Sequence, residues 1–208
     1  MSDQKDWNAF ALLLIDVQQD FWPADTAQAF PDFQSHVEQL LSFCRTSGID
    51  IVHIRAQFEP DQSDWMVKYI AQGSMPCIRG TSGAEILPCA QEQQGEHVVI
   101  KHTFDAFHNP EVLTHLRQRH KRFILTAGLV TSVCVFLTTA SAAQKGFLTA
   151  IVEDCCADDQ DQHIQTINHY PFIFERTTVD QLNENYRPWM NKVESIPNPV
   201  VTQNRSIS

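Results

Sequence analysis

Six short apolar runs recur along the chain, and polar or turn-forming residues bound each of them. Runs of this length without polar alternation are typical of strands that are buried on both faces of a sheet. They cover residues 9–15, 49–54, 97–100, 123–127, 148–152 and 172–174. The pattern therefore predicts six strands.

Amphipathic segments separate these runs. The clearest covers residues 33–47, where Asp32 can cap the start, Gly48 ends the pattern and one face is apolar. Further helices are predicted from Asn109-Pro110 onward, over 132–145 and over 160–169. Strands that alternate with helices predict an α/β fold of three layers, α/β/α. Its sheet is expected to be open, six-stranded and mostly parallel, with right-handed crossovers.

Two regions interrupt this alternation. Residues 57–88 form a long excursion that Gly, Pro and Ser punctuate, and we expect it to cover a site. Residues 191–208 are polar and read as a tail, which could pack on a second subunit. We therefore predict one domain over 1–208 and a homo-oligomer, either a dimer or a tetramer.

Composition narrows the class of protein. The chain has 208 residues, 43% of them hydrophobic and 19% charged, as expected of a globular domain. A net charge of −10 without a basic run argues against nucleic-acid binding. The first apolar run is too short to span a bilayer, and the amino-terminal residues lack the basic start of a signal peptide. We expect a cytoplasmic protein whose six cysteines are free thiols.

Cys134 has the most informative position of the six cysteines. It follows a predicted buried strand and the break at Gly128, and it lies in the first turn of the next predicted helix. The helix dipole and the free N–H groups of such a turn favour a thiolate. A buried cysteine is more often a small core residue, so position alone does not decide the role of Cys134.

Two charged residues end other predicted strands. Asp16 closes the first strand, and Lys101 closes the third. Ligands of open α/β sheets bind at the carboxyl edge, where the strand order reverses. If the first and fourth strands are neighbours, Asp16, Lys101 and Cys134 meet there as base, cation and nucleophile. Taken singly, Asp16 could be a turn or cap residue, and Lys101 could simply face water.

With these residues in this order, the chain resembles the isochorismatase-like cysteine hydrolases over residues 9 to 185. The order and spacing of several stretches carry the resemblance: Leu13-Leu-Ile-Asp-Val-Gln-Gln-Asp-Phe21, Gly80-Thr-Ser-Gly-Ala-Glu85, Ile100-Lys101 with Phe107 beyond, Gly128-Leu-Val-Thr-Ser-Val-Cys-Val135, Gly146-Phe147 and Glu153-Asp-Cys-Cys-Ala157. The resemblance implies a catalytic triad of Asp16, Lys101 and Cys134. It also implies a cis peptide between Leu129 and Val130, with the Val130 and Cys134 N–H groups as an oxyanion hole.

The chain departs from the resemblance at the metal site. Members such as nicotinamidases bind a divalent metal through an Asp-x-His element just after the second strand. Here Ala56 and Phe58 stand where those ligands would be, and His53 lies inside the strand pattern. We therefore expect no metal and no other cofactor, and the departure weighs against nicotinamidase activity.

The predicted function is hydrolysis of a C–N bond in a small amide, ureido or carbamoyl compound through a Cys134 thioester. True isochorismatases in this family can act without the cysteine, so its presence favours C–N cleavage. The candidate substrate contacts are Phe21, Trp65, Phe107 and Thr131, with Trp22 as a weaker one. Two alternatives stay open: vinyl-ether hydrolysis of an isochorismate-like diacid, and a non-catalytic binding or oligomerisation module.

Overall fold

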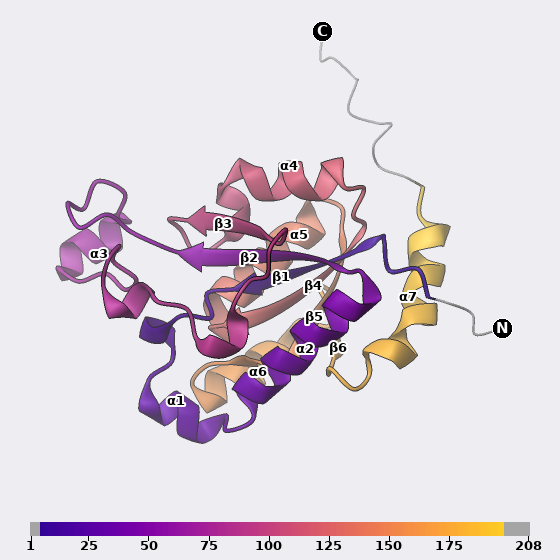
Figure 1. Cartoon of the computed structure of the whole chain (residues 1–208), viewed down its shortest axis with the longest axis horizontal. Helices are drawn as coiled ribbons and strands as arrows, with labels where there is room; N and C mark the ends of the chain where they lie inside the picture. Colours follow the sequence, from indigo (N-terminus) through magenta and orange to yellow (C-terminus); the bar gives the residue numbers. More distant parts are fainter. Residues whose placement is uncertain (1–4, 198–208) are drawn as a thin grey trace, which may run out of the picture.

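The computed structural model describes residues 5–197 and shows a three-layer α/β/α arrangement (Figure 1). Its six strands are β1 (Phe10–Ile15), β2 (Asp50–Ala56), β3 (His97–Lys101), β4 (Phe123–Leu129), β5 (Leu148–Ala157) and β6 (Glu175–Thr177). The longer helices are α2 (Phe33–Ser47), α4 (Pro110–Gln118), α5 (Phe136–Gln144), α6 (Gln160–His169) and α7 (Leu182–Ser195). Two one- to two-turn helices, α1 (Ala24–Ala29) and α3 (Val67–Gln72), lie in the connections.

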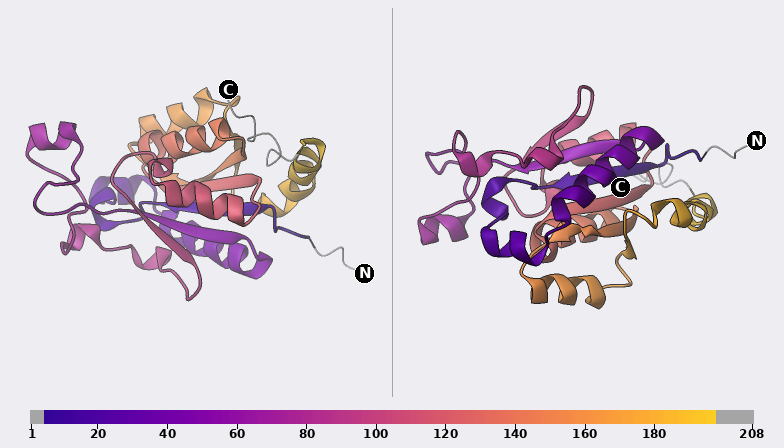
Figure 2. Two further views of the ribbon diagram at one scale, coloured as in Figure 1. Left: turned by 90° about the horizontal axis from the view of Figure 1, so that it is seen from above. Right: turned by 60° about the horizontal axis from the view of Figure 1, so that its bottom comes forward.

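All six strands pair in parallel, in the order β3-β2-β1-β4-β5-β6. The α/β class and the parallel open sheet predicted from the sequence are therefore confirmed. The direction of winding reverses between β1 and β4, so right-handed crossovers place α2 on one face and α4, α5 and α6 on the other. Figure 2 shows these two helical layers with the sheet between them.

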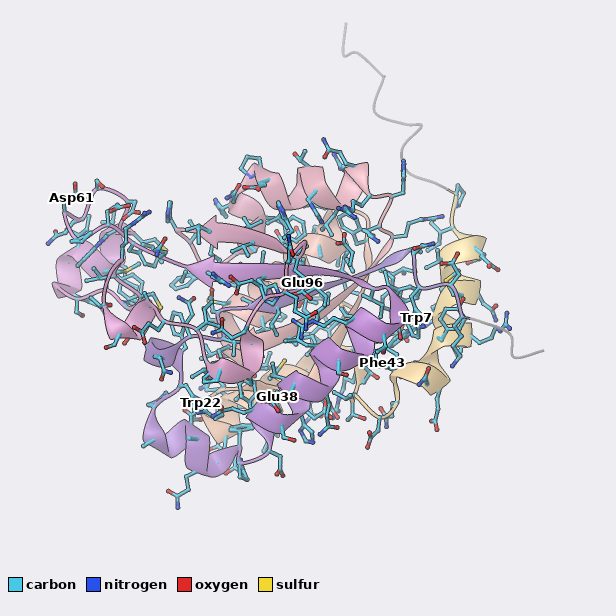
Figure 3. All side chains as sticks on the ribbon, viewed as in Figure 1. Trp7, Trp22, Glu38, Phe43, Asp61 and Glu96 are labelled. Carbon is cyan, nitrogen blue, oxygen red and sulfur yellow. The ribbon has the colours of Figure 1, made fainter. Side chains whose placement is uncertain are left out.

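The core lies between these layers, and β1 and β4 are buried along their whole length. Their apolar runs have no exposed face, which explains why the sequence shows no polar alternation there. At the amino ends of these strands, Trp189 of α7 packs on Phe10 and Phe123, with ring centroids 6.2 and 4.7 Å away. Trp7 contacts Phe43 beside them, as Figure 3 shows.

The carboxyl-terminal region differs from the sequence-based expectation. Residues 191–195, which we predicted to begin a tail, complete α7, and Val193 is buried. Pro188 inside the segment obscured the helical pattern, because proline removes a backbone donor and usually ends a helix. Of the rest of the predicted tail, residues 198–208 lie outside the described residues. The last strand is also shifted: residues 171–173 form a turn, Phe172 is exposed, and β6 begins at Glu175.

The excursion over residues 57–88 extends beyond the carboxyl ends of β1 and β2 and carries α3 (Figure 1). Its own small apolar cluster contains Ala56, Phe58, Met75 and Cys77. Asp20 fixes the excursion to the end of β1, since its carboxylate accepts a 2.6 Å hydrogen bond from the Cys77 N–H. A Cβ atom at Gly83 would lie about 2 Å from this carboxylate, so the contact requires glycine.

Candidate active site

The carboxyl ends of β1 and β4 approach each other unusually closely. Gly128 has a φ of 120°, and a Cβ atom there would lie 2.0 Å from the Ile15 carbonyl oxygen. Only glycine permits this approach. Asp16 follows Ile15 in a left-handed conformation (φ 51°), which is uncommon for a residue with a side chain. Its carboxyl group is fully buried.

Lys101 links Asp16 to Cys134. Its Nζ lies 2.7 Å from Asp16 Oδ2 and 3.4 Å from Cys134 Sγ, and it donates a 2.8 Å hydrogen bond to the Thr103 carbonyl. The segment after β3 is held in place because Asp105 accepts a hydrogen bond from Ser141 of α5. Asp16 after β1 and Cys134 in the turn after β4 therefore both contact the ammonium group of Lys101, at the end of β3.

Cys134 lies in a short π-helical turn, Thr131–Val135, that connects β4 to α5. The peptide bond between Leu129 and Val130 is cis, as the sequence resemblance implies. The N–H groups of Val133 and Val135 both bond the Val130 carbonyl, at 3.2 and 3.3 Å. The turn therefore winds around that carbonyl and presents Cys134 to the crevice between β1 and β4.

Burial dominates the electrostatics of these groups. It raises the pKa of the Asp16 carboxyl above its ordinary value, although the Lys101 charge lowers that pKa in part. Desolvation would lower the pKa of Lys101, but the neighbouring Asp16 and Cys134 raise it above the ordinary value. Lys101 therefore stays protonated and is the stable cation of the cluster.

The helix start favours a Cys134 thiolate, but burial acts on the pKa of this thiol in the opposite direction. Burial raises the pKa of Cys134 above that of a free thiol, and the Asp16 carboxylate raises it further, while Lys101 lowers it only in part. The dipole of one short turn does not offset the loss of solvation. With its pKa raised, Cys134 needs a base to remove its proton when it reacts.

The other five cysteines are free and buried, and among residues 5–197 only Cys134 accepts a hydrogen bond from a lysine ammonium group. Burial raises the pKa of Cys89 to about 11 and raises the pKa of the other four as well. Cys134 is thus distinguished from them by its direct contact with Lys101 and not by a lowered pKa.

A cavity of about 410 Å³ opens beside Cys134 and Lys101. This volume is within the range of small-molecule sites. Its wall is mainly apolar and combines the excursion, the Thr103–Phe104 segment and the turn of Cys134: Phe21, Ala56, Phe58, Met66, Lys68, Tyr69, Met75, Pro76, Thr103, Phe104, Val130, Ser132, Val133, Phe136 and Leu137.

Of the predicted substrate contacts, Phe21 lines this cavity, but Trp65, Phe107 and Thr131 do not. Trp65 supports the excursion from within, where its indole N–H donates to the Glu59 carbonyl at 2.7 Å. Phe107 is buried against Phe147. Thr131 points away from the cavity and bonds His163. We withdraw these three assignments.

The weaker candidate, Trp22, stacks on Phe33 at the start of α2, with ring centroids 4.6 Å apart. Figure 3 shows it on the side of α1 and α2, away from the outer tip of the excursion at Asp61. Its role is to attach α1 to the core, and it does not line the cavity beside Cys134.

Sequence reasoning missed most of the aromatic wall. Tyr69 and Phe104 lie 6.2 Å apart between ring centroids, and Lys68 Nζ lies 5.3 and 5.7 Å from the two rings. Phe104 could have been found from its place three residues after Lys101. Tyr69 could not, because α3 is a single short helix inside an irregular segment.

The residues present do not fit the metal site implied by the resemblance. Ala56 and Phe58 line the apolar cavity, and neither side chain can ligate a metal. His53 is buried in β2, where it bonds Glu96 at 2.8 Å. Within residues 5–197, no group of three or more His, Cys, Asp or Glu side chains could hold a metal ion.

The isochorismatase domain profile matches residues 10–188, most of the chain and all six strands. The chain belongs to the isochorismatase family. One relative is the uncharacterized isochorismatase family protein YddQ of Bacillus subtilis, which is 27% identical over 71% of this chain and 77% of YddQ. Another is Nicotinamidase 3 of Arabidopsis thaliana, which is 25% identical over 79% of this chain and 81% of the plant protein.

Solved structures of the family share this fold. The isochorismatase family protein of Desulfovibrio vulgaris superposes with a TM-score of 0.77 at 26% identity, covering 85% of this chain and 97% of its own. Within the described residues, no helix is both long and apolar enough to cross a membrane.

Proposed function

We propose that this isochorismatase-family protein hydrolyses the C–N bond of a small amide, ureido or carbamoyl compound through a thioester on Cys134. The observation that carries the proposal is the position of Lys101 Nζ, 2.7 Å from the Asp16 carboxylate and 3.4 Å from the Cys134 sulfur, in the wall of a mainly apolar cavity. Base, cation and nucleophile in contact beside a cavity are what covalent hydrolysis requires.

In the first half of the reaction, Asp16 accepts the thiol proton while Cys134 Sγ attacks the substrate carbonyl carbon. The raised pKa of Asp16 suits this exchange, because a base closer to neutrality accepts the proton more readily. Lys101 balances the negative charge that moves between carboxylate and sulfur. The N–H groups of Val130 and Cys134 stabilise the oxyanion of the tetrahedral intermediate.

In the second half, the intermediate expels its nitrogen, which takes the proton from Asp16 and leaves as ammonia or an amine. An acyl thioester remains on Cys134. Asp16, again a carboxylate, then removes a proton from water as the water attacks the thioester. Collapse of this second intermediate releases the acid and returns the proton to Cys134.

The cavity wall argues against the diacid alternative. An isochorismate-like diacid needs several cations, and Arg55 and Arg79 are paired with Glu92 and Glu59 instead of lining the cavity. Apart from Lys101, which is committed to Asp16, Lys68 is the only cation among the described cavity-lining residues. This wall favours a substrate with an apolar body and at most one anionic group.

Nicotinamidase 3, the plant relative, supports C–N hydrolysis as a chemistry of this family by its name. The missing metal-ligand types at Ala56 and Phe58 and the apolar wall around them favour a different amide for this chain. A non-catalytic module remains the second candidate, favoured only by the raised pKa of the Cys134 thiol.

A panel of neutral and monoanionic amides, ureides and carbamates assayed for ammonia or amine release tests the proposal. We expect turnover of at least one aromatic or branched aliphatic amide by the wild type and none by Cys134→Ala. Release at the same rate by Cys134→Ala would exclude the thioester route. A folded wild type that turned over nothing, with Cys134 inert to alkylation at pH 9, would favour the non-catalytic module.

Assembly and location stay predictions. Exposed apolar side chains of Val67 and Ile70 on α3, Leu137 at the cavity mouth and Phe172 are consistent with a homo-oligomer. Light scattering on the eluting protein gives the mass, and a monomer would contradict this part. The expected cytoplasmic location is tested by fractionation of the source cells.

A further inference from the structure

The turn that carries Cys134 is held by two side chains outside the proposed triad. Asp158 lies just before α6, and His163 lies in its first turns. The hydroxyl of Thr131 and Nδ1 of His163 are 2.8 Å apart. The N–H and hydroxyl of Ser132 both donate to Asp158 Oδ2, at 2.8 and 2.5 Å. Two consecutive residues of the turn are therefore fixed by separate partners, which we call the α6 clamp (Asp158 and His163).

The clamp acts on the segment that the proposed chemistry uses most. Thr131 and Ser132 lie between Val130 and Cys134, whose N–H groups form the proposed oxyanion hole. Thr131 is fully buried, so its hydroxyl needs a partner inside the protein. Ser132 lines the substrate cavity. Its N–H lies at the start of the turn, where backbone donors have no partner within the turn itself, and it donates to Asp158 instead. The clamp supplies the hydrogen-bond partners of both side chains.

The clamp is itself rigid. Asp158 Oδ1 accepts the N–H of Asp159 at 2.8 Å, which orients the carboxylate so that Oδ2 faces Ser132. Asp159 caps α6 through the N–H groups of Asp161 and Gln162. The ring of His163 is one turn into this helix and packs edge-on against Phe30, with centroids 5.0 Å apart. The clamp therefore transmits the position of α6 to the turn.

We propose that Asp158 and His163 are positioning residues that hold the Val130–Cys134 turn in its oxyanion-binding conformation. This inference rests on the proposed function. Oxyanion donors act only if they are aimed before the charge develops, and loss of one donor typically costs about 10²–10³ in kcat. Release of the turn should therefore slow acyl transfer much more than it weakens substrate binding.

The test compares matched variants of each clamp residue on the best amide of the panel. Asp158→Ala removes the acceptor, whereas Asp158→Asn keeps an oxygen for Ser132. Asp161→Ala is the control, because it removes an equal charge from the first turn of α6. His163→Leu removes the ring nitrogen, whereas His163→Asn places a polar atom near the Nδ1 position. Three readouts are needed: kcat against KM, the iodoacetamide rate of Cys134, and hydrogen exchange of the peptide that contains residues 130–135.

We expect Asp158→Ala and His163→Leu to lower kcat by roughly 10- to 100-fold, with KM changed by less than about 3-fold. Asp158→Asn and His163→Asn should recover about half of the loss on a logarithmic scale. Alkylation should stay near the wild-type rate, because it needs the Asp16–Lys101–Cys134 contacts but no oxyanion hole. Hydrogen exchange over 130–135 should accelerate in the two clamp-breaking variants alone.

Equal kcat values for Asp158→Ala and Asp161→Ala would overturn the clamp, as would a loss of kcat without faster exchange over 130–135. The two clamp arms are independent, so one variant that fails to fold leaves the other decisive. If the wild type turned over no amide, the proposed function would fail separately. The exchange measurement would still decide whether Asp158 and His163 hold the turn.

Discussion

At the scale of single residues, Lys101 contacts two groups that need its positive charge at different stages of the reaction. It faces a carboxylate that needs a counter-charge at rest and a sulfur that needs one during attack. A buried lysine with one missing partner would lose much of its stabilisation, since desolvation works against its charge. The ion pair with Asp16 thus serves both to keep Lys101 charged and to hold it beside Cys134.

Asp16→Asn and Lys101→Ala should therefore fail differently. The amide at position 16 cannot accept the thiol proton, so turnover should fall by roughly 10³-fold or more. Removal of Lys101 should raise the pKa of Cys134 further, because the charge that opposes its burial is lost. A pH–alkylation profile beside turnover measures both. If Lys101→Ala changed neither the profile nor the turnover, the three-residue mechanism would have to be abandoned.

At the scale of elements, two segments define what the cavity can accept. The end of β2 contributes Ala56 and the following Phe58, and the excursion contributes α3 with Lys68 and Tyr69. Within the described residues no carboxylate pairs with Lys68, whose ammonium instead lies near the Tyr69 and Phe104 rings. The excursion thus supplies one positive charge to an otherwise apolar wall.

Lys68→Met should discriminate between substrates of different charge. It keeps most of the apolar stem and removes the charge, so kcat/KM should fall by about 3- to 5-fold for monoanionic amides, as expected of an exposed ion pair. Neutral amides of the same size should be unaffected. Lys145→Met is the control, because Lys145 lies over the buried Phe107 outside the cavity. An equal effect on neutral and anionic substrates would remove Lys68 from substrate recognition.

The end of β2 also leads to a prediction about metals. Ala56 and Phe58 offer no ligand atoms, so activity should survive dialysis against EDTA, and added zinc or manganese should not increase it. Metal content measured before and after dialysis is the control for removal. Loss of turnover on chelation, restored by one of these ions, would show that other side chains build a site.

Elements with a regular hydrophobic pattern can be predicted from the sequence, whereas elements that depend on tertiary contacts cannot. β1 and β4 are predictable because burial on both faces leaves uninterrupted apolar runs, and Asp16, Lys101 and Cys134 follow from strand ends. Helix α7 was not predicted because Pro188 lies inside it. The cavity-lining residues Tyr69 and Met66 were not predicted because α3 is too short to show a helical pattern in the sequence. The buried environment of Cys134, which raises its pKa, is likewise a property of the assembled site.

At the scale of the whole molecule, Glu96 connects the layers. It pairs with Arg45 of α2 at 2.7 Å and with His53 of β2 at 2.8 Å, and Figure 3 shows it between these elements. Burial alone would raise the pKa of Glu96. The hydrogen bonds from Arg45, from the Gln93 backbone and from His53 instead lower this pKa to about 2.

This lowered pKa predicts how stability depends on acid. The contribution of Glu96 should be complete above about pH 4.5, the pKa of an unperturbed glutamate, and should be lost as the pH falls toward 2. Glu96→Gln should destabilise the fold by about 1–2 kcal/mol at pH 7 and by less at pH 3. Urea unfolding at both pH values measures this, with Glu111→Gln, near the protein surface, as the control. A constant difference between pH 7 and pH 3 would contradict the assignment.

The proposed mechanism depends on a covalent bond between the acyl group of the substrate and the sulfur of Cys134. Rapid mixing of the wild type with the best amide of the panel, followed by acid quenching and intact-mass measurement, detects that bond directly. We expect an added mass equal to the acyl group, formed within one turnover and located on Cys134 by peptide mapping. It should be absent from Cys134→Ala. Turnover without any acyl adduct, together with full activity of Cys134→Ala, would contradict this mechanism.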